Sequence, residues 1–300
     1  MTYIERKKVK GKDYFYLSKN IRVSGDKWKK IRKYVGSSLE NLDAVEKELT
    51  LAVPIKRLMS HRQMQFIDLI RIAYLEQHKI NKSLWKTEKD QLVSFIYNTN
   101  AIEGNSLSYE ETRGILEGQM PKATYEKRDV AEVKNMKKCI DFLFEYTGSL
   151  NEDFMLQLHG MQMAGVHPEA GKIRTRQNIV GNYLPPKPEE VKGELTLFFN
   201  WYQQAERLLH PFELAALVHL KLVRIHPFMD GNGRISRLLM NYVLLKNEYP
   251  LLNIFNSEKM FYYLTLKEVD AKQKEKPFVT YLYRAYLNQY KNYLLKKEPR

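Results

Sequence analysis

Apolar residues recur every three or four positions along most of this 300-residue chain. This spacing places them on one face of an α-helix, so it predicts helices that bury that face in a shared core. The segments with this pattern are 39–49, 62–78, 85–101, 108–118, 127–146, 151–163, 188–209, 212–225 and 234–247. We therefore expect a mainly α fold.

Two of these segments carry start signals. Ser108 followed by Glu111 is a capping-box pattern, and Pro188 with two glutamates after it opens its own segment. The stretch 171–188 interrupts the helical pattern, because glycines and prolines frame two short extended pieces there. This stretch predicts a β-hairpin on the surface of the helical body.

Residues 1–36 follow a different rhythm. The runs TYIERKKV, DYFYLSKNIRV and KWKKIRKYV are separated by the turn-like KGK and SGD, which predicts a small antiparallel sheet of three strands. Twelve Lys and Arg against three acidic residues give this segment +9 of the chain's net charge of +14. We expect a basic β appendage at 1–37 and a helical domain at 38–300.

This basic sheet has two interpretations. In the first it is structural, with Tyr14, Tyr16, Trp28 or Tyr34 packed against the helical body and the lysines in solvent. In the second, basic residues interleaved with aromatic ones bind nucleic acid. The sequence leaves both open.

Cellular context follows from what the sequence lacks. It has no run of about 18 apolar residues, and MTYIERKKVK has no apolar signal-peptide core, so we expect a cytoplasmic protein without a membrane span. The single cysteine, Cys139, cannot form an intramolecular disulfide and lies in a helical pattern. We expect it in the core, with no catalytic role.

Residues 226–237, HPFMDGNGRISR, connect two helical segments and concentrate reactive side chains. Pro227 discourages continuation of the first helix, and Gly231 and Gly233 let backbone N–H groups turn inward where the next helix begins. The positive end of the helix dipole favours negative charge at that point. The loop therefore predicts an anion-binding nest.

Charged side chains around this nest indicate the kind of anion. Arg234 and Arg237 supply two guanidinium groups, which suit a di- or triphosphate. Asp230 could hold Mg²⁺ bridging such phosphates, and His226 is a base that titrates near neutral pH. The related stretch LLHPFEL has no glycines or arginines after His210, so we interpret it as a helix-start turn.

The loop resembles the signature of the Fic domain family, HxFx(D/E)GNGRxxR, at every specified position. The resemblance extends over residues 60–290, where 171–188 is similar to the family's flap, and it does not include the basic sheet. It implies a Fic-type helical bundle with a β-hairpin flap. It also implies an enzyme that transfers AMP from ATP to a hydroxyl of a target protein, with Mg²⁺ and release of pyrophosphate.

The resemblance implies roles for individual residues. His226 would take the proton from the target hydroxyl, and Asp230 would hold Mg²⁺. Arg234 would meet the γ-phosphate and Arg237 the β-phosphate. The residues implied to cradle phosphate are Gly231, Asn232 and Gly233.

Further nucleotide and target contacts follow from the same resemblance. The flap residues implied to clamp the target by strand addition are Asn178, Ile179, Val180 and Gly181. Tyr262 and Tyr263 resemble a tyrosine pair that some members place near the nucleotide base. Those members have an asparagine where this chain has Asp270, and simple helix packing explains the two tyrosines equally well.

A second, shorter pattern lies in an expected helix near residues 87–104. Thr99-Asn-Ala-Ile-Glu103-Gly104 fits the family's inhibitory helix pattern, (S/T)xxxE(G/N). The resemblance implies that Glu103 pairs with Arg234 and thereby removes a partner of the γ-phosphate. Taken alone, these residues are a helix C-terminus closed by Gly104, with Glu103 in solvent.

We therefore expect a Fic-type protein adenylyltransferase restrained by Glu103. Its partner would be a Ser, Thr or Tyr hydroxyl of a target protein or of the chain itself, and a homodimer stays open. Two other enzymes fit: a hydrolase that removes AMP, with Glu103 aligning water, and a transferase of another nucleotide or phosphate group. The alternative outside enzymes is a basic nucleic-acid-binding regulatory module.

Overall fold

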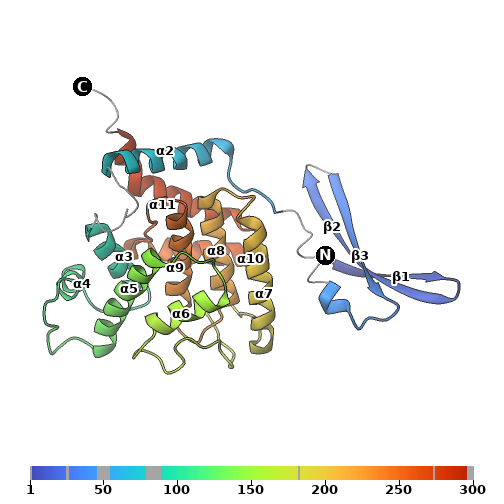
Figure 1. The fold of residues 1–300 in the computed structure, drawn as a ribbon, viewed down its shortest axis with the longest axis horizontal. Coiled ribbons are helices and arrows are strands. Elements are labelled where there is room, and N and C mark those ends of the chain that lie inside the picture. Colours follow the sequence, from blue (N-terminus) through green and yellow to red (C-terminus); the bar gives the residue numbers. More distant parts are fainter. Residues whose placement is uncertain are drawn as a thin grey trace. The chain divides into compact units, whose positions relative to one another are not determined.

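The computed structural model describes residues 2–24, 27–45, 55–78, 89–181, 183–272 and 274–295. The chain divides into two compact units, residues 1–56 and residues 57–300 (Figure 1). The expected boundary at residue 37 lies one residue after the sheet, which ends at Gly36. The first unit continues beyond this boundary to residue 56.

The first unit contains the predicted antiparallel sheet of three strands, in the order β1-β2-β3. The strands are β1 (Thr2–Val9), β2 (Lys12–Ser24) and β3 (Lys27–Gly36). Lys10 and Gly11 join β1 to β2 with φ angles of 49° and 78°. Positive φ at both positions of a two-residue turn matches the twist of the flanking strands, so this turn fixes the register.

The sheet has its small core on the face opposite to the Tyr16–Tyr34 pair. Leu17 and Val35 are buried, and Leu42 and Val45 pack against them from the segment after β3. Tyr34 pairs across the strands with Tyr16, on the other face, and is 51% exposed. Of the aromatic residues expected to pack, Tyr34 therefore lies largely in solvent, and Trp28 is outside the side chains described.

The second unit is helical. Its helices are α2 (His61–His78), α3 (Lys89–Ala101), α4 (Tyr109–Leu116), α5 (Lys127–Glu145), α6 (Glu152–Gln162), α7 (Pro188–Ala205), α8 (Pro211–Ile225), α9 (Asn232–Lys246), the short 3₁₀ turn η1 (Asn256–Glu258), α10 (Lys259–Lys272) and α11 (Lys276–Leu295). The helices predicted between residues 62 and 247 are confirmed, except that residues 206–209 are not helical. Residues 85–88 lie outside the described part, as does 46–49 of the first expected helix, whose residues 42–45 are helical.

The predicted start signals are confirmed. The Ser108 hydroxyl accepts the Glu111 N–H, and the Glu111 carboxylate accepts the Ser108 N–H at 2.9 Å. Pro188 opens α7, and Pro211 opens α8 with His210 as its N-cap, so LLHPFEL is the helix-start turn expected.

The helices α10 and α11 were not predicted. In α10 the apolar side chains do not form one stripe, because Met260, Phe261 and Leu264 are 69%, 67% and 54% exposed. Apolar residues on the solvent side blur the three-to-four spacing that identifies a helix.

The prediction of two paired strands at 171–188 is wrong, and the hairpin is reduced to a single bridge. The backbones of Val180 and Tyr183 exchange two hydrogen bonds of 3.0 and 2.9 Å, and this is the only bridge among the described residues of the segment. Some backbone groups of the segment bond to groups other than a paired strand, among them the Arg174 N–H and the carbonyls of residues 176 and 186. We call residues 171–187 the flap segment.

Helices α8 and α9 form the centre of this unit. α9 packs against α3, α5, α6 and α8, and its residues from Arg234 to Leu244 are buried (Figure 1). The α8–α9 loop is thus held at a junction of helices from distant parts of the sequence. No helix in the described ranges is long and apolar enough to span a bilayer.

Candidate active site

The loop between α8 and α9 begins with a residue in an unusual conformation. His226 caps α8 with φ 52° and ψ 57°, in the left-handed region. Its ring atom Nδ1 lies 3.1 Å from the Val223 carbonyl oxygen. Only an N–H can donate to a carbonyl, so the neutral ring carries its proton on Nδ1 and Nε2 keeps a free lone pair. Burial lowers the pKa of His226, the Val223 carbonyl opposes this, and Arg174 lowers it further.

Two side chains fix the shape of the loop. The Asn232 side chain accepts the Phe228 N–H at 2.9 Å and donates to the Phe228 carbonyl at 2.8 Å. Phe228 is fully buried and stacks on His159, with ring centroids 3.6 Å apart. The Asn232 side chain therefore closes the loop, and only its backbone N–H is left for a phosphate.

His159 of α6 joins the loop to the start of the flap segment. Its Nδ1 accepts the Gly171 N–H at 2.9 Å, so Nε2 carries the proton and donates to the Asp230 carbonyl at 3.0 Å. Burial lowers the pKa of His159 to about 4, which keeps the ring neutral. This connection was not predicted, because an isolated histidine in a helical pattern carries no signal of its own.

The predicted nest lies at the N-terminus of α9. Gly231 has φ 82°, and a Cβ at this position would meet Gln162 Oε1 and Met163 Sδ at 2.9 Å, so only glycine fits. A Cβ on Gly233 would lie 2.2 Å from the Glu103 carboxylate. A carboxylate therefore lies directly over the backbone that the sequence assigned to phosphate.

Glu103 and Thr99 both bind Arg237. The Glu103 carboxylate is 2.7 Å from Arg237 Nη2, and the Thr99 hydroxyl and carbonyl accept from the same guanidinium at 2.7 and 2.9 Å. Gly104, with φ 100°, closes the helix after them. Glu103 is thus not merely solvated, and Nη1 of Arg237 has no hydrogen-bond partner within the described residues.

The predicted pairing of Glu103 with Arg234 is wrong. Arg234 lies on another face of α9, with its guanidinium 2.7 Å from Glu132 and 3.1 Å from Asp230. Gly233 and Arg237 are four positions apart, about one helical turn, so both face Glu103. Arg234, one position after Gly233, is rotated by about 100° around the helix axis. The phase of α9 therefore selects Arg237.

Asp230 has partners on both carboxylate oxygens. Oδ2 lies 2.7 Å from Arg128, and Oδ1 accepts from Arg234 at 3.1 Å and from the Gly231 N–H at 2.6 Å. Burial raises the pKa of Asp230, but these partners outweigh it and hold the pKa below its usual range. No cluster of three His, Cys, Asp or Glu suited to a metal exists in the part of the chain described. A lone carboxylate fits a Mg²⁺ that takes its other oxygens from phosphate and water.

Hydrogen bonds join the flap segment to the α8–α9 loop. The Asn178 amide donates to the Phe228 and Met229 carbonyls at 3.0 and 3.2 Å. Arg174, which is 2% exposed, donates to the carbonyls of His226 at 2.8 Å, of residue 176 at 3.1 Å and of residue 186. These bonds tie the segment to the α8–α9 loop and to itself. The side chains of Ile179 and Val180, next to Gly181, are 76% and 39% exposed.

The two tyrosines differ: Tyr262 fits simple helix packing, and Tyr263 lies close enough to Glu103 to stay a candidate for the nucleotide site. Tyr262 is 1% exposed, and its hydroxyl lies 3.2 Å from His219, so it packs in the core. Tyr263 is 39% exposed, and its hydroxyl donates to the Ile102 carbonyl at 3.4 Å, next to Glu103. Asp270 forms an ion pair of 3.0 Å with Arg224.

Comparison with known proteins agrees with this geometry. Residues 149–244 match the Fic/DOC family. A protein adenylyltransferase Fic of Nematostella vectensis is 31% identical over 83% of this chain and 64% of its own length. The protein of that name in Drosophila erecta is 34% identical over 75% of this chain and 46% of its own.

Solved structures share the fold. Fic-1 (aa134–508) from C. elegans has a TM-score of 0.69 and 30% identity, covering 78% of this chain and 72% of that one. By contrast, the chain spans only 64% and 46% of the two full-length relatives above. With the signature loop complete and the fold shared over most of both chains, the chain belongs to the Fic/DOC family.

Proposed function

We propose that this chain is a Fic-type protein adenylyltransferase that transfers AMP from ATP to a Ser, Thr or Tyr hydroxyl of a target protein, including its own. The observation that carries the proposal is the nest at Gly231 and Gly233. The Glu103 carboxylate lies against Gly233, the nest and His226 are on the same loop, and Nη1 of the adjoining Arg237 has no hydrogen-bond partner among the residues described. An anion site and a neutral base side by side suit nucleotide transfer to a hydroxyl.

The chemistry needs one proton transfer and one exchange of bonds at phosphorus. Nε2 of His226 accepts the hydroxyl proton while the oxygen bonds to the α-phosphorus. The bond from that phosphorus to the oxygen bridging to the β-phosphate breaks, and pyrophosphate leaves with the electron pair. Asp230 would hold Mg²⁺, and the bound ion neutralises phosphate charge.

We further propose that Glu103 inhibits the enzyme through Arg237. The carboxylate pairs with this arginine and lies over Gly233, so a phosphate can take the nest only after Glu103 leaves. This replaces the expected competition at Arg234. Since Arg237 is the guanidinium that Glu103 withholds, we assign it to the terminal phosphates of ATP.

The exposed part of the flap segment is our candidate for target binding. Ile179 and Val180 are exposed beside a backbone bridge, while Asn178 anchors the segment to the loop. A target strand could pair along this short edge, with its hydroxyl directed to His226. The cytoplasmic location and a homodimer stay predictions.

Label position in ATP tests the reaction. The purified full chain and its Glu103→Gly variant are incubated with Mg²⁺ and ATP labelled at the α- or γ-phosphate. AMP transfer predicts label on protein from the α-position alone, whereas phosphate transfer predicts label from the γ-position. Label from neither, with ATP binding established, would favour the alternative in which Glu103 aligns water for AMP removal.

The basic sheet supports a second candidate function, nucleic-acid binding. One face carries Tyr14, Tyr16 and Tyr34, and the Arg32 guanidinium lies 3.7 Å from the Tyr16 ring centroid. Lys7 pairs with Tyr14 on this face, so Lys7→Glu in the full chain should weaken binding to a generic DNA duplex. Lys8→Glu, on the opposite face, is the matched control. Equal effects, or retention that does not depend on salt, would favour the structural interpretation.

A further inference from the structure

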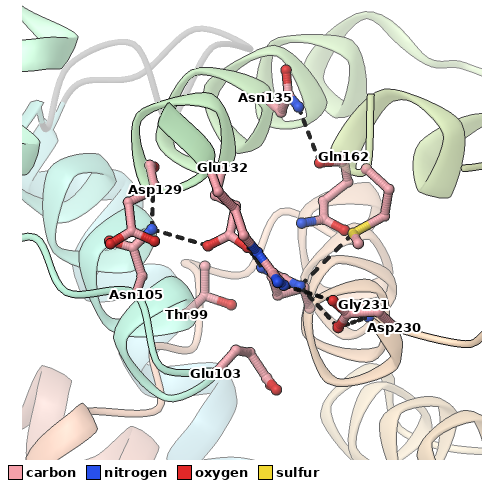
Figure 2. Close-up of polar contacts among 12 residues, drawn as sticks. Thr99, Glu103, Asn105, Asp129, Glu132, Asn135, Gln162, Asp230 and Gly231 are labelled. Carbon is pink, nitrogen blue, oxygen red and sulfur yellow. Dashed lines mark hydrogen bonds and ion pairs between the residues drawn. The ribbon is translucent and has the colours of Figure 1, made fainter. Parts of the chain in front are cut away.

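Four charged side chains form a closed ring beside the nest. Arg128 is 3.1 Å from Glu132 and 2.7 Å from Asp230, while Arg234 is 2.7 Å from Glu132 and 3.1 Å from Asp230. Positive and negative charges alternate around the ring. Two members come from the signature loop and two from α5, outside the residues that match the family. In Figure 2, Glu132 lies between Asn105 and the loop that carries Asp230.

Burial separates the ring into a fixed half and an exchangeable half. The side chains of Arg234 and Glu132 are 1% and 3% exposed, whereas those of Arg128 and Asp230 are 57% and 32% exposed. Glu132 also accepts the Asn105 amide at 2.9 Å. Removing one partner from the buried pair would leave an uncompensated charge away from water, which is costly. The exposed Arg128 can move into solvent at little cost.

The contact of Arg128 with Asp230 occupies the atom that a metal ion needs. Asp230 Oδ1 is already taken by Arg234 and the Gly231 N–H, so Oδ2 is the oxygen with an exchangeable partner. A guanidinium and a divalent cation at that oxygen repel each other, so they compete for it. Binding of the metal therefore disfavours the contact of Arg128 with Asp230.

We propose that Arg128 occupies the cation position of Asp230 in the nucleotide-free protein and that a metal-bound nucleotide displaces it, while the buried Glu132 keeps Arg234 against the same carboxylate. Arg128 is thus a positioning residue that competes with the metal, and Arg234 orients Asp230. This inference rests on the proposed function, since it takes a metal–ATP complex as the ligand of the loop.

Nucleotide binding with and without metal tests the competition. The probe is α,β-methylene-ATP, whose α–β linkage cannot transfer AMP, and the protein is the full chain with Glu103→Gly to clear the nest. The dissociation constant is measured by calorimetry in Mg²⁺ and in EDTA. The value in EDTA divided by the value in Mg²⁺ is the factor by which the metal tightens nucleotide binding. The metal-free nucleotide carries more negative charge than its Mg²⁺ complex, so a general loss of positive charge also raises this ratio, and a control variant must measure that contribution.

Adding Arg128→Gln should raise the ratio about twofold to fivefold, the range expected from releasing one exposed ion pair. Arg128→Lys, which keeps the charge, should stay near the parent ratio. Lys127→Gln removes an exposed charge one residue away and measures the general effect of charge, so it should change the ratio much less than Arg128→Gln does. In a chain that also carries Asp230→Asn, Arg128→Gln should have no effect on the ratio, because the shared partner is gone.

A ratio that stays constant or falls in Arg128→Gln would overturn the inference, and a fall would make Arg128 a nucleotide ligand instead. A rise of the same size in Lys127→Gln would also overturn it, because the effect would then be a general one of charge. Nucleotide binding with these results leaves the proposed function intact. A chain that binds no nucleotide in either condition contradicts the proposed function as well.

Discussion

The contact between Glu103 and Arg237 predicts how strongly the proposed transferase would be restrained. The two groups are 2.7 Å apart, and Arg237 is 1% and Glu103 25% exposed. A hydrogen bond between charged groups contributes about 1.5–3 kcal/mol, and this is what a phosphate must replace before ATP binds productively. Since each 1.36 kcal/mol is tenfold in rate, Glu103→Gly should raise AMP transfer from ATP about 10- to 160-fold.

The assay is the initial rate of protein labelling from α-labelled ATP at saturating Mg²⁺. Glu103→Gln keeps a hydrogen-bond acceptor without the charge and should give an intermediate gain. Glu126→Gly is the control, because it removes an exposed carboxylate that makes no capping bond at the start of α5. Adding Arg237→Ala to Glu103→Gly should remove the gain, since the phosphate loses the same guanidinium.

The melting temperature gives an independent check of the same contact. Without nucleotide, Glu103→Gly leaves the buried Arg237 without its carboxylate, so the variant should melt below the parent, and ATP should restore much of the difference. Unchanged or reduced labelling by Glu103→Gly, with ATP binding established, would refute inhibition by this contact. If Arg234→Ala, and not Arg237→Ala, removed the gain of Glu103→Gly, the competition would lie at Arg234 instead.

Other contacts predict further outcomes. His226→Ala should bind ATP nearly as the parent does and yield no labelled protein, so undiminished transfer would exclude His226 as the base. The pKa of His159 is lowered from 6.5 to about 4, so its contribution to stability, about 3 kcal/mol, should be complete above pH 6.5 and lost as pH falls to 4. Urea unfolding across this range should show a weaker pH dependence in His159→Gln, and an identical dependence would contradict the buried neutral ring. Burial raises the pKa of the Cys139 thiol to about 12, so a thiol reagent should react with the folded chain only as fast as it unfolds.

The signature loop could be predicted from sequence because its chemistry is local. Base, carboxylate, glycines and arginines lie within twelve residues, and the helix that follows fixes their relative directions. The error in pairing Glu103 with Arg234 came from helical phase. The four-residue spacing of Gly233 and Arg237 was present in the sequence, and it predicts that these two share a face.

The contributions of α5 and of the flap segment could not be predicted in the same way. Arg128 meets Asp230 across 102 residues of sequence, and an Arg-Glu pair four residues apart is typical of a solvated helix face. Arg174 binds carbonyl groups, which every residue has, so no pattern of side chains identifies its partners. In the sheet, both faces of β2 carry aromatic or apolar residues, so alternation predicts the strands but not the face that is buried.

Charge balance supports assigning the proposed inhibition to Glu103 and not to its neighbours. Three arginines face three carboxylates around the nest, so the phosphates of ATP add negative charge to a balanced site. One carboxylate must then give up its arginine. Glu132 is 3% exposed and has three polar partners, and Asp230 would hold the metal in the proposed function. Glu103 is 25% exposed and lies just beyond the end of α3, so it can turn into solvent without breaking a helix, and the phosphate then takes over Arg237.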